Sequence, residues 1–276
     1  MPVIQKTKEE LENIGSIQTL SGVLRDLSIT RVQHLREEFQ RNIDFYIEVD
    51  EIFNQVQILV NEYYASTAAE MRKRPSANIA ITSNHRFYGS LNHEVMDYFL
   101  ENWDDADQHV VIGQTGQAHM ENDKRYKDCK FIIFEDDNPD RMEVQKVVSL
   151  AKGYSKAMVY YPKYKTPFHQ EPSVIDIVRL AKNRESEKSG LSEFIFEPEL
   201  PIIQDFFSTQ VQYVLIQRVM LETDLSRMAT RLVRMDTAEN YASEMYSKKK
   251  RELNDTIQRQ LDVQLFESLS GLVKNK

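Results

Sequence analysis

The stretch "LETDLSRMATRLVRM", residues 221–235, carries apolar side chains spaced alternately four and three residues apart. This spacing is typical of a coiled-coil seam, because residues repeated every 3.5 positions return to the same side of a helix. The pattern is interrupted at Glu239 and then resumes. The predicted seam comprises Leu221, Leu225, Met228, Leu232 and Met235, followed by Leu253, Ile257, Leu261, Leu265 and Leu269.

The positions of the prolines predict how far the helices extend. Proline breaks helix interiors, and the chain has none between Pro2 and Pro75 and none after Pro201. The C-terminal stretch alone would form a helix of ~70 residues, about 100 Å long, so both ends of the chain are expected to be long, projecting helices. The N-terminal stretch carries its own apolar stripe, made of Phe39, Ile43, Tyr46, Val49, Phe53, Val56, Val60 and Tyr63.

Between these stretches, short apolar runs alternate with helical patterns. Such alternation indicates a mostly parallel, Rossmann-like sheet. The predicted strands are 78–82, 109–113, 130–134 and 157–161, and the predicted helices between them are 91–103 and 141–154. A polar run at 181–193 is expected to close this domain. The predicted segments are therefore an N-terminal helix (1–75), the sheet domain (76–193), and a foot with the C-terminal helix (194–276).

Composition excludes several classes of protein. The hydrophobic share of 41% and charged share of 28% are typical of a folded chain rather than a disordered one. A net charge of -8 argues against a general nucleic-acid binder. Cys129 is the only cysteine, which excludes an intrachain disulfide and fits a reducing compartment. No apolar run approaches the ~20 residues of a membrane span, so any membrane association is expected through a partner.

The central segment lacks the common active-site motifs. It has neither a GK[ST] phosphate loop nor GxGxxG, and Gly113 and Gly116 in "VVIGQTGQAHM" fit a plain strand-to-helix turn better than a phosphate loop. The six histidines are scattered without an HExxH pair, and Ser83 beside His85 has no oriented base. No catalytic, cofactor or metal site is therefore predicted, and a small nucleotide-binding enzyme is an alternative that rests only on "GQTG".

Three blocks of sequence carry the motifs of a known family. "ITSNHRFYGSLN" (81–92) resembles the motif "ITSDRGLCGGLN", and "VYYPKYKTPFHQEPSV" (159–174) is similar to "Y-x-K-F-x-S-x-x-x-Q-x-P". "LSRMATRLVRMDTA" (225–238) resembles "xxRMxAMxxATDNA", with Arg227, Met228 and Asp236 in register. In this order the blocks resemble the gamma subunit of F-type ATP synthases, the rotor shaft of that family, and the resemblance covers nearly the whole chain.

The resemblance implies an α/β fold in which the N- and C-terminal helices form a long antiparallel coiled coil beside the Rossmann-like domain. It implies a central rotor shaft that is not an enzyme and needs no cofactor, because the family's nucleotide sites belong to the alpha/beta head. The implied partners are the alpha and beta subunits, the epsilon subunit and the membrane c-ring, without nucleic acid or direct membrane insertion. The implied location is peripheral, on the cytoplasmic face of the inner (plasma) membrane.

Specific contacts follow from the same resemblance. "FIFEPEL" matches the foot of the shaft, where Phe194, Phe196 and Glu197 are expected to meet the ring and the epsilon subunit. The family usually carries Arg-Gln and Thr-x-Glu on the C-terminal helix, whereas this chain has neutral side chains there, including Leu253. The expected head contacts are Arg227, Met228, Asp236, Lys248, Lys249, Lys250, Arg251, Asn254, Gln258 and Gln260. These departures favour a divergent rotor, with a gamma-like subunit of a specialised F-type-derived ATPase, or an adaptor outside ATP synthesis, as alternatives.

Overall fold

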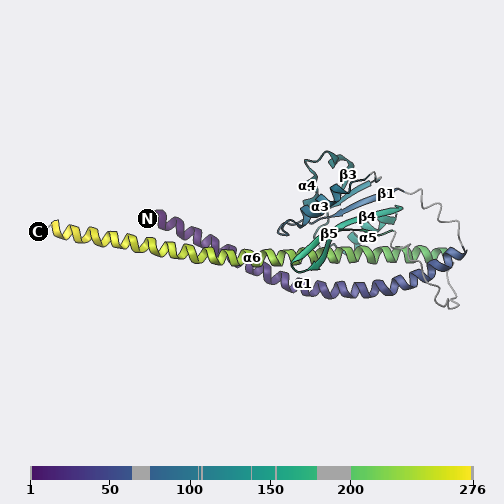
Figure 1. Ribbon diagram of the computed structural model, residues 1–276, viewed down its shortest axis with the longest axis horizontal. Helices are drawn as coiled ribbons and strands as arrows, with labels where there is room; N and C mark the ends of the chain where they lie inside the picture. Colours follow the sequence, from purple (N-terminus) through teal and green to yellow (C-terminus); the bar gives the residue numbers. More distant parts are fainter. Residues whose placement is uncertain are drawn as a thin grey trace. The chain divides into compact units, whose positions relative to one another are not determined.

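The computed structural model describes residues 2–63, 75–104, 106, 108–137, 139–152, 154–178 and 200–274 (Figure 1). The chain divides into two compact units. Met1–Ile29 and Arg231–Lys276 form what we call the two-helix unit, and Thr30–Thr230 form the sheet unit.

Two long helices, one near each end of the chain, make up most of the described residues outside the sheet domain, as the proline positions predict. Helix α1 spans Pro2–Tyr63 and helix α6 spans Leu200–Lys274, with 62 and 75 residues respectively. Pro2 and Pro201 lie in the first turns of these helices, where the missing N–H costs no helical hydrogen bond. Both predicted long helices are therefore confirmed.

In the two-helix unit, α1 and α6 run antiparallel and are joined by small residues and ion pairs. Lys249 Nζ lies 3.1 Å from Glu10 Oε2 near one end, and Arg25 reaches Glu239 near the other. A Cβ on Gly22 would lie 3.3 Å from Glu239 Oε1, so the glycine leaves room for this carboxylate between the helices. The interruption of the apolar seam at Glu239 is thus a polar contact within the pair.

The C-terminal part of the predicted seam is not covered by α1. Glu10 is opposite Lys249 and α1 begins eight residues before Glu10, so the pairing ends near Ile257 of α6. The next seam residues, Leu261, Leu265 and Leu269, are 53%, 62% and 59% exposed. The expectation that they pack against the N-terminal helix is therefore wrong.

The sheet unit contains a five-stranded sheet in the order β3-β2-β1-β4-β5. Its strands are β1 (Ser76–Ile81), β2 (Gln108–Ile112), β3 (Cys129–Ile132), β4 (Lys156–Thr166) and β5 (His169–Asp176). The first four are parallel, with Ile79 opposite both Val110 and Val159, which confirms the predicted strands. Strand β5 pairs antiparallel with β4 and was not predicted, because its sequence is polar and contains Pro172, which an edge strand tolerates.

Helices cover both faces of this sheet (Figure 1). They are α3 (Leu91–Glu101), α4 (Gln114–Met120) and α5 (Arg141–Lys152), and a short 3-10 helix spans Lys124–Asp128. Because neighbouring residues of a strand point to opposite faces, Ile79 packs with α5 and α6 while Ala80 packs with α3 and α4. The predicted helix 141–154 is thus α5, wedged between the sheet and α6.

A third cluster joins both long helices to the loop after β1. Val32 and Leu35 of α1 pack with Leu225 and Met228 of α6, and Tyr88 and Leu91 complete the cluster. The predicted seam residues Leu225 and Met228 are therefore buried, but part of their packing comes from the sheet domain.

The turn from β2 into α4 requires a glycine. Gly113 has a φ of 102°, and a Cβ there would lie 2.4 Å from the carbonyl oxygen of Thr82. We expect Gly113→Ala to lower the free energy of unfolding by about 2–4 kcal/mol, because it combines backbone strain with a clash against the main chain. Urea unfolding of the purified chain measures this loss. Gly15→Ala is the control: its Cβ would make only an ordinary 3.6 Å contact with Tyr246, so a helical alanine should be neutral or stabilising.

Candidate functional site

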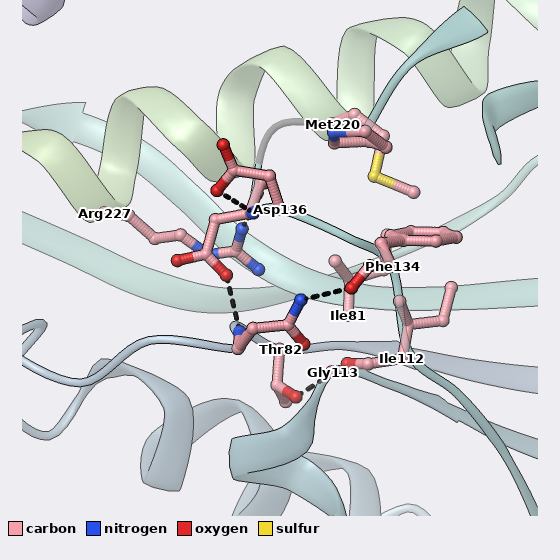
Figure 2. Close-up of a pocket in the computed structure, with 11 residues that line it drawn as sticks. Ile81, Thr82, Ile112, Gly113, Phe134, Asp136, Met220 and Arg227 are labelled. Atoms are coloured by element: carbon pink, nitrogen blue, oxygen red, sulfur yellow. Dashed lines mark hydrogen bonds between the residues drawn. The ribbon is translucent and has the colours of Figure 1, made fainter. Parts of the chain in front are cut away.

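The carboxyl edge of the parallel strands is the place to look for a ligand, because open α/β sheets bind ligands there. In this chain the edge holds a cavity of about 10 Å³ (Figure 2), just large enough for one water molecule. Its lining is Ile81, Thr82, Asn84, Ile112, Gly113, Phe134, Asp136, Asp137, Pro139, Met220 and Arg227. The edge is therefore almost completely filled by the protein itself.

Arg227 of α6 is one of these lining residues. Its side chain is directed toward the ends of the strands (Figure 2), and the residue is only 3% exposed. One guanidinium nitrogen donates to the carbonyl oxygen of Asp137 over 3.1 Å. Burial lowers the pKa of Arg227, while the negative charges of Asp137 and Asp224 oppose that shift. A guanidinium stays charged in proteins. A buried positive charge therefore lies at the edge of the sheet where open α/β sheets bind their ligands.

Asp137 connects this cation to the loop after β1. Its carboxylate accepts hydrogen bonds from the backbone N–H of Asn84 and, over 2.8 Å, from the hydroxyl of Tyr88. The side chain of Asn84 also donates to the carbonyl oxygen of Phe134 over 2.7 Å. We call Arg227, Asp137, Asn84 and Tyr88 the Arg227 node. It joins α6, the loop after β3 and the loop after β1.

A second charge pair stands one helical turn away. Asp224 is 3% exposed, and its carboxylate lies 3.0 Å from a guanidinium nitrogen of Arg31 on α1. Burial raises the pKa of Asp224, whereas Arg31 and Arg227 lower it. Burial likewise raises the pKa of Glu222, against the attraction of Arg218. The segment of α6 from Glu222 to Arg227 therefore buries several ionisable groups, each with a partner on another element or a neighbouring turn.

The start of α4 is also closed to an anion. The first free N–H groups of a helix are the usual phosphate ligands. In α4 the first three N–H groups donate instead to residues of the loop after β1. The N–H of Gln114 donates to Asn84 Oδ1 over 3.1 Å, and that of Thr115 donates to the Ser83 carbonyl over 2.9 Å. The N–H of Gly116 donates to Thr82 Oγ1 over 2.9 Å. The "GQTG" segment is therefore a strand-to-helix turn whose amides are already paired.

Ser83 has no activating base. Its hydroxyl donates to the carbonyl oxygen of His85 over 2.7 Å and accepts from the Asn92 amide. The His85 ring instead points toward Asp136, with 3.6 Å between Nε2 and Oδ1. This arrangement orders the loop after β1 and does not form a nucleophile.

The structure places the predicted contact residues in two different environments. Arg227 and Met228 are buried in the sheet unit, and Lys249 is bound within the two-helix unit by Glu10 and Glu252. Asp236, Lys248, Lys250, Arg251, Asn254 and Gln258 are exposed on α6, and Gln260 is partly exposed. The predicted foot contacts Phe194, Phe196 and Glu197 lie outside the described residues.

Sequence reasoning missed the partners of Arg227. Asp137 lies in the acidic run "EDDNPD" shortly after β3, and Tyr88 lies within the quoted block 81–92, after β1. Loops at the carboxyl ends of parallel strands meet at one edge of the sheet, so both residues could have been assigned to that edge. The contact between them could not, because β2 lies between β1 and β3. Their link to α6 depends on the packing of a distant helix, which no local pattern contains.

The chain combines a Rossmann-like domain with two long helices, one of which covers the carboxyl edge of the sheet, and this is the architecture of a helical stalk protein. The family model described as ATP synthase matches residues 4–273. The ATP synthase gamma chain of Mycoplasmopsis pulmonis is 22% identical over 289 residues, which cover 99% of this chain and 100% of the relative.

Solved structures show the same fold. In the Euglena gracilis mitochondrial ATP synthase, a chain of the rotor in rotational state 1 matches with a TM-score of 0.63 at 13% identity, covering 94% of this chain and 99% of that one. A chain of the OSCP/F1/c-ring structure in rotational state 3 matches with a TM-score of 0.67 at 13% identity, covering 99% and 94%. The chain therefore belongs to the ATP synthase family, as a gamma-type, non-catalytic stalk subunit. None of its described helices is both long and apolar enough to cross a membrane.

The node makes a prediction about stability. Asp137→Ala removes the acceptor of Tyr88 and Asn84 and leaves Arg227 with less compensating charge. We expect a loss of about 3–5 kcal/mol, as for other buried pairs that lose one partner.

Chemical denaturation of the purified variant measures that loss, and Asp136→Ala is the matched control. The Asp136 side chain is 72% exposed and accepts one backbone hydrogen bond, so its removal should cost about 1 kcal/mol. Equal losses in the two variants would contradict the node.

Proposed function

We propose that this chain transmits rotation from a membrane ion-driven ring to the alpha/beta head of an F-type ATP synthase or ATPase. The proposal assigns it the alpha and beta subunits, an epsilon subunit and a c-ring as partners. The F1 and c-ring in the Euglena assembly and the gamma-chain relative support this assignment. On this proposal the chain is a peripheral part of a membrane complex, on the cytoplasmic face.

One observation supports enclosure by a partner more than any other: the two-helix unit exposes more apolar side chains than it buries. Among its described residues only Leu11 and Ala242 are buried hydrophobics. Its exposed large hydrophobics are Val3, Ile17, Leu20, Val23, Leu27, Ile29, Tyr241, Leu261, Val263, Leu265, Phe266 and Leu269. Apolar surface of this extent marks an interaction site, which here fits the inside of a ring of subunits.

The two helices offer different chemistry to that ring. Ile17, Leu20 and Leu27 make an apolar stripe on α1, whereas Lys248 and Lys250 belong to a basic run on α6. A rotating helix pair whose two sides differ chemically presents a different contact to each surrounding subunit. Differential contacts of this kind shift open and closed populations of the catalytic subunits.

Co-purification tests the proposal directly. A tagged copy of the chain, expressed in its own cells, should retain alpha and beta subunits after gentle extraction of the membrane complex. Capture of the chain without either subunit would contradict a rotor function and favour an adaptor outside ATP synthesis.

The basic run provides a test of the proposed head contacts. Lys248, Lys250 and Arg251 are exposed, whereas Lys249 is paired with Glu10. We expect simultaneous replacement of the three exposed residues by Gln to lower the steady-state ATPase rate of the assembled complex several-fold. The loss should shrink at high salt, because exposed charges are screened over about 10 Å at 0.1 M ionic strength.

Asn254→Ala is the neutral comparison for that experiment. Losing one neutral hydrogen bond costs about 1 kcal/mol or less, so turnover should fall less than about fivefold. Complexes are matched for subunit content before the assay. A collapse of activity in Asn254→Ala alone would show that the neutral residue, and not the basic run, makes the decisive contact.

A further inference from the structure

His93 and His119 bring two ring nitrogens together on the surface of the sheet unit. Their Nδ1 atoms are 3.0 Å apart, and the ring centroids are separated by 5.1 Å with an interplanar angle of 56°. His93 belongs to α3 and His119 to α4. No contact with the Arg227 node involves these rings, and the proposed rotor function does not use them.

Both histidines are carried by firmly packed helices. Val95, Met96 and Phe99 anchor α3 in the core. Met120, the residue next to His119, is buried in the same cluster and anchors α4. Sites on packed helices hold their geometry better than sites on loops. The close approach of the two nitrogens is thus fixed by the fold of the domain.

Asp97 is next to the other ring nitrogen of His119. Its carboxylate oxygen lies 3.3 Å from His119 Nε2, within ion-pair distance. A neutral His119 ring that carries its proton on Nε2, facing this carboxylate, has its lone pair on Nδ1, which is the nitrogen beside His93. A carboxylate behind a histidine is the usual support of a metal-binding imidazole, because it fixes the tautomer and raises the basicity of the ring.

We propose that His93 and His119 bind a divalent transition-metal ion through their Nδ1 atoms, with Asp97 as the positioning residue. Two nitrogens about 2.0 Å from one ion are about 2.8 Å apart at a 90° angle and about 3.3 Å apart in a tetrahedron. The observed 3.0 Å fits adjacent positions of a square-planar or octahedral ion. Imidazole ligands in that geometry favour Cu²⁺ or Ni²⁺ over Mg²⁺ or Ca²⁺.

Binding costs little rearrangement. The proton of His93 moves from Nδ1 to the exposed Nε2, so the hydrogen bond between the rings is replaced by two metal–nitrogen bonds. Among the described residues no group of three or more His, Cys, Asp or Glu side chains surrounds an ion position. Water therefore completes the coordination shell, and the ion links α3 to α4.

Electron paramagnetic resonance of the full-length, tag-free chain titrated with CuCl₂ tests the site. We expect one tight equivalent whose nitrogen hyperfine pattern shows two imidazoles. His93→Ala and His119→Ala should each remove that pattern and weaken binding at least tenfold. Asp97→Asn should keep the two-nitrogen pattern but lower the affinity by about 10–100-fold.

His85→Ala is the matched control, because His85 is exposed on the loop after β1 and also faces a carboxylate, that of Asp136. It should leave the pattern and the affinity unchanged. Persistence of the two-imidazole pattern in the His93→Ala, His119→Ala double variant would overturn the proposal. An effect of His85→Ala equal to that of Asp97→Asn would overturn it as well.

Discussion

The buried guanidinium of Arg227 is the constraint on which the sheet unit depends. A cation inside a protein costs several kcal/mol unless charge and hydrogen bonds compensate it, and its compensation comes from separate parts of the chain. The Asp137 carbonyl accepts its hydrogen bond, and the Asp137 carboxylate is held by Asn84 and Tyr88. Asp224 adds negative charge and is itself balanced by Arg31. The charge of Arg227 is therefore fully compensated only when the node and the neighbouring Asp224–Arg31 pair, which adds α1, are both in place.

The burial of Arg227 at the strand ends also distinguishes this domain from Rossmann-like domains that bind a nucleotide. Rossmann-like sheets host many unrelated functions, so the function must be argued from the site. At the edge where a nucleotide would bind, Arg227 lines the small cavity and the first amides of α4 are bonded to Thr82, Ser83 and Asn84. The described part of the sheet unit therefore offers no open nucleotide site at this edge.

How far the sequence predicted the structure varied with the type of signal. The long helices and four parallel strands were predictable, because proline positions and apolar runs such as 109–113 are local signals. Strand β5 was missed because its edge position, not its composition, makes it a strand. Leu261 and Leu265 follow the seam spacing but have no α1 beside them, and periodicity cannot show where a partner helix ends.

The candidate site shows the same difference between local sequence signals and long-range packing. Arg227 and Met228 were singled out from a motif, but the motif does not say which way a helical side chain points. The structure turns both inward, toward the strand ends and Tyr88. The exposed basic run at Lys248, by contrast, kept the surface position that its composition suggested. Charge runs are predictable as surface, whereas a single charged residue next to an apolar seam can be either buried or exposed.

The Arg227 node also has a mechanical consequence for a stalk subunit. Within the sheet unit, Arg227 and Ser226 of α6 donate hydrogen bonds to the carbonyls of Asp137, in the loop after β3, and Pro162, within β4. Buried hydrogen bonds resist small displacements more than apolar contacts do, because their energy falls steeply with distance and angle. We therefore expect a torque on this part of α6 to reach the sheet through these hydrogen bonds. A purely apolar seam would let the helix slide or rotate in its groove at lower cost, which explains why ionisable groups are buried at this position despite their desolvation penalty.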